Sequence, residues 1–245
     1  MILEICADSV TSVKAACEGG ADRIELCADL IIGGTTPGYG LAKKAREAAD
    51  IPIRALIRPR FGDFCYDDDA FKVMLEDIRL FREMGINGVV TGVLKPDGCL
   101  DMERMKRLKE AAGDMDFAVH RAFDVSKDPF RSLKEAIDLG AATLLTSGQA
   151  PTAWEGRELL ARLNAEGGDK IQIMAGSGVS EANIRDLARA TGLTAFHMSG
   201  KKETQGAMAF KRTGIPMGLP GFDEYTILRT DAEAVKAAAN VIKSL

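Results

Sequence analysis

Two hydrophobic patterns take turns along this chain. Short segments in which apolar and polar residues alternate are typical of β-strands, and longer segments with apolar residues every three to four positions are typical of amphipathic helices. The strand pattern predicts strands at 2–6, 22–27, 53–58, 88–93, 116–121, 143–147, 171–175 and 195–199. The helical pattern predicts helices at 10–18, 39–49, 69–84, 101–112, 129–139, 153–165, 181–190 and 231–243.

Eight strand–helix units in 245 residues match the number and size of a (β/α)8 TIM barrel. The alternative is a doubly wound open sheet, whose strands are buried on both faces and therefore read as continuously apolar. Here polar residues recur on one face of the predicted strands: Glu4, Glu25, Arg54, Arg58, His120 and His197. This ring favours a closed barrel, and we expect residues 1–245 to form a single TIM-barrel domain.

The ends of several predicted helices carry capping signals. Asp67 to Asp69 precede a helix and favour its dipole, and Pro129 suits a first helical turn. Ser180 is a predicted N-cap, and Thr230 with Glu233 has the spacing of a capping box. We expect a long irregular loop at about 200–230, either as a lid over the mouth of the barrel or as a contact surface.

Two near-copies of a short pattern open the chain, Ile2–Cys6 and Arg23–Cys27. Alternation puts the apolar residues of each copy on one face, so Glu4 and Cys6, like Glu25 and Cys27, share the other face. A carboxylate that points into a protein interior is costly unless it is paired or used. Two of them at matching places on consecutive strands indicate a site.

Both histidines of the chain, His120 and His197, fall late in predicted strands. The working residues of a TIM barrel lie at the carboxyl ends of its strands, and histidine exchanges protons near neutral pH. Each histidine is therefore either part of a site or a core side chain satisfied by a neighbouring carboxylate. Both alternatives stay open.

Arginines end the third predicted strand and offer planar groups that hold carboxylates or phosphates. Arg58 and Arg60 are candidates for orienting an anionic ligand, whereas Arg54 is expected to neutralise Glu4 and Glu25 across the barrel floor.

Two glycine-containing turns predict an anion pocket. The first, Gly176, Ser177 and Gly178, follows the seventh strand, and the second, Ser199 and Gly200, follows the eighth and is flanked by lysines. Glycine allows close backbone approach, and N–H groups at a helix start bind anions. The alternative is a tight turn that needs glycine for its dihedral angles.

Cys6 and Cys27 are the cysteine pair placed to share a metal ion, since equivalent positions on adjacent strands lie about 4.8 Å apart. Thiolates suit Cu(I) or Zn(II). The alternative is that both cysteines pack as small buried hydrophobes.

Charge and composition exclude several classes of protein. The net charge of −4 gives no support for nucleic acid or a membrane surface as a partner. No apolar stretch is long enough to span a bilayer, and no signal peptide is visible. Five cysteines without CxxC spacing argue against a disulfide framework, so a cytoplasmic protein is expected.

Taken together, several motifs make the chain resemble the copper homeostasis protein CutC family. They are Glu4–Ala7, Gly19–Cys27, Gly33–Pro37, Ile57–Arg60, Gly62–Tyr66, His120–Asp124, Leu145–Gly148 and Gly176–Gly178. The resemblance implies a cytosolic, usually homo-oligomeric TIM barrel linked to copper tolerance, with copper(I) on Cys6 and Cys27. It implies no established reaction.

Three functional hypotheses follow. The first is copper(I) binding through Cys6 and Cys27, with no other cofactor. The second is an enzyme of lyase, isomerase or hydrolase type acting on a small anionic or phosphorylated metabolite at the barrel mouth. Its candidate catalytic residues are Glu4, Glu25, Arg58, Arg60, His120, Asp124 and His197. The third, an assembly protein that works through the 200–230 loop, has little specific support.

Overall fold

The chain closes into a parallel barrel. The computed structural model describes residues 1–215, 217–218 and 223–245, and in it each strand pairs with the next while the eighth pairs with the first. The strands are β1 (Ile2–Ala7), β2 (Arg23–Leu26), β3 (Ile53–Leu56), β4 (Gly88–Thr91), β5 (Asp116–Val119), β6 (Thr143–Thr146), β7 (Gln172–Ala175) and β8 (Ala195–Met198). The predicted TIM barrel is confirmed, and the open sheet is excluded.

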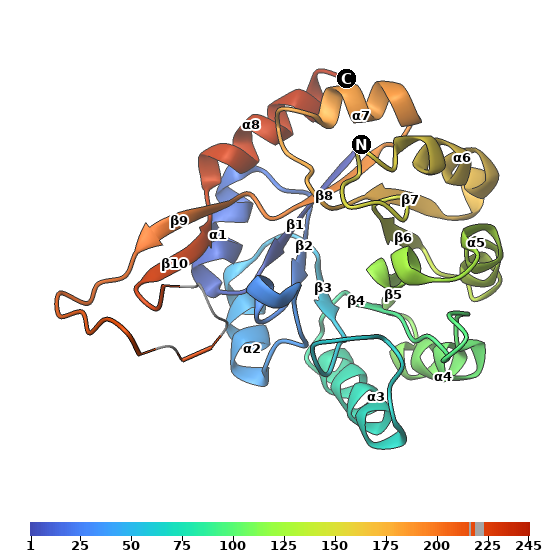
Figure 1. The fold of residues 1–245 in the computed structure, drawn as a ribbon, viewed down its shortest axis with the longest axis horizontal. Coiled ribbons are helices and arrows are strands. Elements are labelled where there is room, and N and C mark those ends of the chain that lie inside the picture. Colours follow the sequence, from blue (N-terminus) through green and yellow to red (C-terminus); the bar gives the residue numbers. More distant parts are fainter. Residues whose placement is uncertain (216, 219–222) are drawn as a thin grey trace.

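Helices surround the barrel, and α8 lies beside α1 so that the ring closes where the chain ends (Figure 1). They are α1 (Val10–Gly19), α2 (Tyr39–Ala48), α3 (Asp68–Glu83), α4 (Met102–Ala112), α5 (Pro129–Asp138), α6 (Arg157–Gly167), α7 (Ile184–Thr191) and α8 (Ala232–Lys243). Short 3-10 helices occur at Leu30–Ile32, Arg121–Val125 and Gly168–Lys170. Among the described residues, no helix has the length and apolar character needed to cross a membrane.

Strand alternation divides the interior into an apolar shell and a polar centre. Leu3, Ile5 and Ile24 point outward, where they join the main hydrophobic cluster beneath the helices. The residues between them face the barrel axis, and Glu4 there contacts side chains of β3 and β8. Removing the apolar shell from water stabilises the barrel, whereas the polar centre is stable only because its charges are paired.

Arg54 forms the centre of the barrel floor. Its Nε donates to Asp116 Oδ2 at 2.9 Å and its Nη2 to Thr143 Oγ1 at 2.9 Å, while its Nη1 lies 3.5 Å from Glu4 Oε2. The predicted pairing with Glu4 is therefore confirmed, whereas the predicted pairing with Glu25 is not found among the ion pairs of the described residues. Asp116, which the sequence analysis did not single out, is the second acidic partner of this buried guanidinium.

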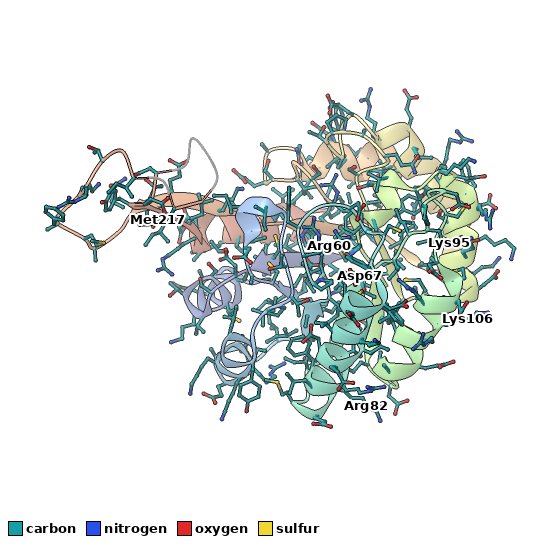
Figure 2. All side chains as sticks on the ribbon, turned by 60° about the horizontal axis from the view of Figure 1, so that its bottom comes forward. Arg60, Asp67, Arg82, Lys95, Lys106 and Met217 are labelled. Atoms are coloured by element: carbon teal, nitrogen blue, oxygen red, sulfur yellow. The ribbon has the colours of Figure 1, made fainter. Side chains whose placement is uncertain are left out.

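The region 200–230 contains a two-stranded antiparallel hairpin, β9 (Lys201–Gln205) and β10 (Thr226–Thr230). The hairpin extends away from the barrel, and Met217 lies in the segment between its two strands (Figures 1 and 2). The prediction of an irregular loop was wrong at these ten positions, because β9 is exposed and polar on both faces and shows no alternation of hydrophobicity. Residues 216 and 219–222 of the predicted loop lie outside the described residues.

Two predicted helix caps were misplaced. Asn183, not Ser180, precedes α7, because the Asn183 side chain accepts from the Ser180 N–H and donates to Gly178 O, and these bonds make a turn. Asp231, not Thr230, caps α8, and the Thr230 hydroxyl donates to Ser199 O.

The predicted caps of α3 and α5 are confirmed: Asp67 caps α3, and Pro129 opens α5.

Replacing Arg54 by Met should destabilise the barrel by about 3 kcal/mol, because it leaves parts of two carboxylates unpaired in the interior. The free energy of unfolding in urea measures this loss. Arg189→Met, at an exposed position of α7, is the matched control and should change it by about 0.5 kcal/mol or less. Equal stability of both variants would contradict the role of Arg54.

Candidate active site

A cavity of about 600 Å³ opens at the carboxyl ends of the barrel strands. Side chains from β1, β2 and β8 line it together with residues that follow β3, β5 and β7, among them Cys6, Glu25, Arg58, His120, Ser177 and His197. The prediction that acidic, basic and imidazole groups from separate strands meet in one place is therefore correct for these residues.

His197 lies between two carboxylates. Its Nδ1 donates to Glu4 Oε1 at 2.9 Å, and its Nε2 lies 3.7 Å from Glu25 Oε2. Burial opposes a charge on this ring, but Cys6, Glu25 and Glu4 outweigh burial and raise the pKa of His197 well above its ordinary value. His197 is therefore an imidazolium whose two N–H groups are both directed at acidic side chains.

Glu4 is a permanent anion beneath this site. Burial alone would raise its pKa, but the hydrogen bond from His197 and the charges of Arg23 and Arg54 lower it to about 2. Arg23 Nε lies 2.5 Å from Glu4 Oε2. Because this carboxylate is already surrounded by cations, it holds its neighbours in place and has no proton to exchange near neutral pH.

Glu25 has the opposite character. Burial raises its pKa to about 7; His197 works against this rise and the nearby Glu4 carboxylate adds to it. Its Oε1 atom is buried and has no hydrogen-bond partner among the described residues. A carboxyl group of this pKa exchanges protons at neutral pH, which is the requirement for a general acid or base.

His120 is a neutral hydrogen-bond donor. Its Nδ1 accepts from the Ala122 N–H at 3.1 Å, so the proton of the neutral ring belongs on Nε2. Burial, assisted by the positive charge of Arg58, lowers the pKa of His120 to about 3. The ring packs against Gly92, where a Cβ would approach Nδ1 to 2.8 Å. Nε2 is buried without a partner in the described part of the chain.

Arg58 fixes the loops around this donor. It donates to Gly34 O at 2.8 Å and to Gly62 O at 3.2 Å, and thereby joins the loops after β2 and β3. Its guanidinium lies 5.2 Å from the centre of the Phe64 ring, and the His120 ring lies 5.0 Å from the same centre. One buried N–H, at Nε, has no partner among the residues described.

Arg60 and Asp124, both candidate catalytic residues, are engaged in local structure. Arg60 forms an ion pair with Asp63 at 2.8 Å and is not among the residues that line the cavity. Asp124 lines the cavity, but its oxygens accept from the Thr146 hydroxyl at 2.5 Å and from the Ser147 N–H and hydroxyl at 3.0 Å. These contacts are those of residues that position loops, and the catalytic roles stay predictions.

The predicted anion loops are only partly at the cavity. Ser177, Gly178 and Ser199 line it, together with Lys201. Gly176 instead allows a close contact, since a Cβ there would lie 2.6 Å from Leu145 Cδ1. Gly200 likewise does not line the cavity and adopts a positive φ of 53°.

Helix α7 does not begin at the first of these loops. It starts at Ile184, after the turn that Asn183 makes, so the predicted helix N-terminus is not the source of anion-binding N–H groups. The backbone N–H groups of Ser177 and Gly178 make no hydrogen bond with any described residue.

The two cysteines are not at equivalent positions. Parallel strands of a barrel are staggered, and here Cys6 pairs with Glu25, which shifts the second sequence copy by two residues relative to the first. Cys6 lines the cavity, whereas Cys27 is completely buried and its thiol donates to Ala7 O at 3.6 Å. Burial, followed by the proximity of Cys6, raises the pKa of Cys27 well above its ordinary value.

A second group of side chains has the spacing of metal ligands. One ligand atom each of Glu4, Glu25 and His197 lies within 4.8 Å of the other two. Arg23 and Arg54 already neutralise Glu4, so a metal cation here would meet two guanidinium groups. This charge balance favours the hydrogen-bonded network over a metal centre.

The sequence analysis missed three residues that organise the site. Arg23 was detectable, because it lies two positions before Glu25 and so shares its face of β2. Asp116 begins β5, and strand alternation likewise turns its side chain toward the barrel axis. Phe64, in the loop after β3, had no periodic signal, and only the structure brings its ring against Arg58 and His120.

Fold and cavity together define a (β/α)8 barrel with a polar site at its carboxyl-terminal mouth. The CutC family model matches residues 1–202. A family protein CutC from Chromobacterium violaceum is 45% identical over 236 residues, which is 96% of each chain. Another from Porphyromonas gingivalis is 44% identical and covers 100% of this chain and 99% of its own. The chain belongs to the CutC family.

Solved structures agree with this assignment. The putative copper homeostasis protein CutC from Streptococcus agalactiae is 31% identical, with a TM-score of 0.77 over 81% of this chain and 99% of its own. Thiamine phosphate pyrophosphorylase from Pyrococcus furiosus has a TM-score of 0.60 at 16% identity over 99% of this chain and 96% of its own, a likeness of fold alone.

Replacing Glu25 by Gln should change the pH dependence of stability. The folded protein binds the Glu25 proton with a pKa of about 7, compared with an ordinary value of 4.5, so wild type loses stability as pH rises from about 5 to about 7. Gln cannot titrate, so the variant should gain stability relative to wild type across this range. Urea unfolding at several pH values measures the difference.

Glu166→Gln is the control for this experiment, because Glu166 is exposed in the last turn of α6. Its curve should run parallel to that of wild type. A difference between wild type and Glu25→Gln that stays constant with pH would contradict the raised pKa of Glu25.

Proposed function

We propose that this protein is an enzyme that transfers a proton on a small anionic metabolite bound in the barrel mouth. One observation carries the proposal: Glu25 Oε1, His120 Nε2 and Arg58 Nε are buried, have no partner in the described part of the chain, and belong to residues that line the same cavity. Buried polar groups in native proteins are nearly always hydrogen-bonded. A single ligand that hydrogen-bonds to all three atoms would explain why each of them lacks a partner in the protein.

Glu25 is the general base in this proposal, with a pKa of about 7 that suits proton transfer at neutral pH. It takes a proton from a carbon next to a carbonyl group. The electron pair of the C–H bond forms a C=C bond to the carbonyl carbon, and the π pair of the C=O bond moves onto the oxygen. The neutral His120 N–H and the Arg58 N–H donate to that oxygen as its negative charge grows. Return of the proton to another carbon, or loss of a leaving group, makes the reaction an isomerisation or an elimination.

Glu4 and His197 act behind Glu25 as positioning residues. The imidazolium of His197 bridges the two carboxylates and fixes the orientation of Glu25. Glu4 anchors the imidazolium and is itself anchored by Arg23.

The rim of the cavity suits an anionic group on the substrate. Arg121 and Lys201 line it, and so do Ser177 and Gly178, whose backbone N–H groups bond to no described residue. The rim offers cations and unpaired N–H groups, and a titrating carboxyl group lies inside. This arrangement favours a substrate whose carboxylate or phosphate stays at the rim while the rest of the molecule points into the cavity.

Hydrogen exchange tests the proposal whatever the final product is. The protein is incubated in D2O with a library of small phosphorylated and carboxylated metabolites, and mass spectrometry detects compounds that gain a deuterium. At least one compound should gain it with wild type, and Glu25→Gln should slow that exchange by about 100-fold or more, since the base is lost.

Glu166→Gln, on the outer surface, is the matched control and should exchange at the wild-type rate. Two results would overturn the proposal. One is the absence of exchange across the library with wild type, and the other is exchange by Glu25→Gln at the rate of wild type.

Copper(I) as a bound cargo is the second candidate. The Streptococcus agalactiae protein carries copper homeostasis in its name, and Cys6 of this chain lines the cavity beside His197. Cys27 would have to lose its proton and its bond to Ala7 O before it joined Cys6 on the ion. This cost makes copper binding the less favoured of the two candidates.

The double variant Cys6→Ser, Cys27→Ser separates the candidates. Under the copper hypothesis it should lose Cu(I) binding, measured in competition with a chromophoric chelator, because both thiolate ligands are gone. Under the enzyme proposal it should still exchange hydrogen, because Glu25 and His120 are unchanged. Cys17→Ser, Cys99→Ser is the control, since these cysteines are outside the cavity lining. Unchanged Cu(I) affinity in the Cys6, Cys27 variant would exclude these two cysteines as ligands.

A further inference from the structure

Trp154, the only tryptophan of the chain, is displayed at the rim of the barrel mouth. It lies in the loop between β6 and α6, and 42% of its surface is exposed. An exposed indole ring leaves apolar area in water unless a ligand covers it, and its flat face is a favourable contact surface for a ligand. Its neighbour Ala153 is completely buried, so the loop itself is well packed.

Contacts on both sides hold this loop rigid. The Ala153 N–H donates to Ser177 O at 2.9 Å, and the Ser177 hydroxyl donates to Pro151 O at 2.8 Å. At its base, Gly148 and Gly156 touch backbone to backbone, and a Cβ on Gly156 would lie 1.9 Å from Ser147 O. These contacts fix the backbone that carries the indole, so a ligand that uses the ring meets a preorganised loop.

A second cavity, of about 290 Å³, adjoins the first at Gly178 and is lined by Trp154. Its lining consists of Thr152, Trp154, Gly178, Asn183 and Asp186, and Gly178 lines both cavities. The Arg157 guanidinium lies over the indole ring at 4.7 Å from its centre and occupies one face. A ligand that stacks on the indole would therefore lie against the other face.

The polar groups of this cavity select the kind of ligand. Asn183 uses its carboxamide in the turn with Ser180 and Gly178. Asp186 is exposed and is the only acid in the lining, and the side-chain hydrogen bonds and ion pairs of the described residues do not include it. A carboxylate accepts hydrogen bonds and repels anions, so it selects against an anionic group here and favours a group that carries N–H or O–H donors.

We propose that this second cavity is a subsite for a ring on the substrate, which stacks on Trp154 and donates hydrogen bonds to Asp186. The inference rests on the proposed function, because the anionic group of the same molecule stays at the rim of the main cavity. A nucleobase and a sugar ring share the required chemistry: a flat or C–H face together with outward N–H or O–H groups.

The single tryptophan makes the subsite measurable. Adenosine 5′-monophosphate, ribose 5-phosphate and glucose 6-phosphate are titrated against the intrinsic fluorescence of Trp154, and calorimetry gives their affinities beside that of inorganic phosphate. At least one ring-bearing phosphate should change the fluorescence and bind about tenfold more tightly than phosphate. The nucleotide and the sugar phosphates distinguish the two sources of the ring.

Substitutions at two positions test the residues named. Trp154→Ala should remove that tenfold gain and leave the affinity for inorganic phosphate unchanged, whereas Trp154→Phe should keep most of it because a stacking face remains. Asp186→Asn should weaken ring-bearing ligands several-fold, and Asp138→Asn, on the exposed face of α5, should not.

The outcomes separate this inference from the proposed function. If phosphate binds but no ring-bearing phosphate binds more tightly, or if Trp154→Ala binds them as wild type does, the subsite is refuted while the main cavity stands. If a ring-bearing phosphate binds through Trp154 while inorganic phosphate does not bind at all, the subsite is supported and the anionic part of the proposed function fails.

Discussion

The buried Glu4 carboxylate is the interaction on which the rest of this barrel depends. A charge in a protein interior is tolerated only when opposite charges and hydrogen bonds surround it. Arg23, Arg54 and His197 supply them from β2, β3 and β8, so one side chain of β1 joins four strands. The same pairing brings a positive imidazolium beneath Glu25 and makes the barrel centre a polar scaffold for the mouth.

From this scaffold two neighbouring acids acquire different chemistry. Glu4 forms ion pairs with several cations and stays ionised. Glu25 has His197 as its one ion-pair partner among the described residues, and burial, with the nearby Glu4 carboxylate, raises its pKa to about 7. Divergent pKa values in one pair of carboxylates are the arrangement that lets one residue hold structure while the other exchanges protons. The neutral His120 completes the contrast, since burial beside Arg58 leaves it a donor.

The sequence was sufficient for the barrel and for the inward ring, because both follow from periodicity. It was insufficient for features that depend on contacts between residues far apart in the chain. The stagger of β1 against β2, which pairs Cys6 with Glu25, depends on barrel closure and is invisible in two matching segments. The tautomer of His120 depends on one backbone N–H, and the start of α7 depends on the Asn183 turn. Local propensity does not encode such contacts.

The loop that bears Trp154 is framed by backbone. Its base is the contact of Gly148 with Gly156, and its side is tied to the main chain of Ser177 and Pro151. A frame of this kind does not depend on which side chain stands at its tip. Substitutions at residue 154 can therefore alter ligand choice without disturbing the loop, whereas the two glycines must remain. The position that is free to evolve is thus separate from the positions that are constrained.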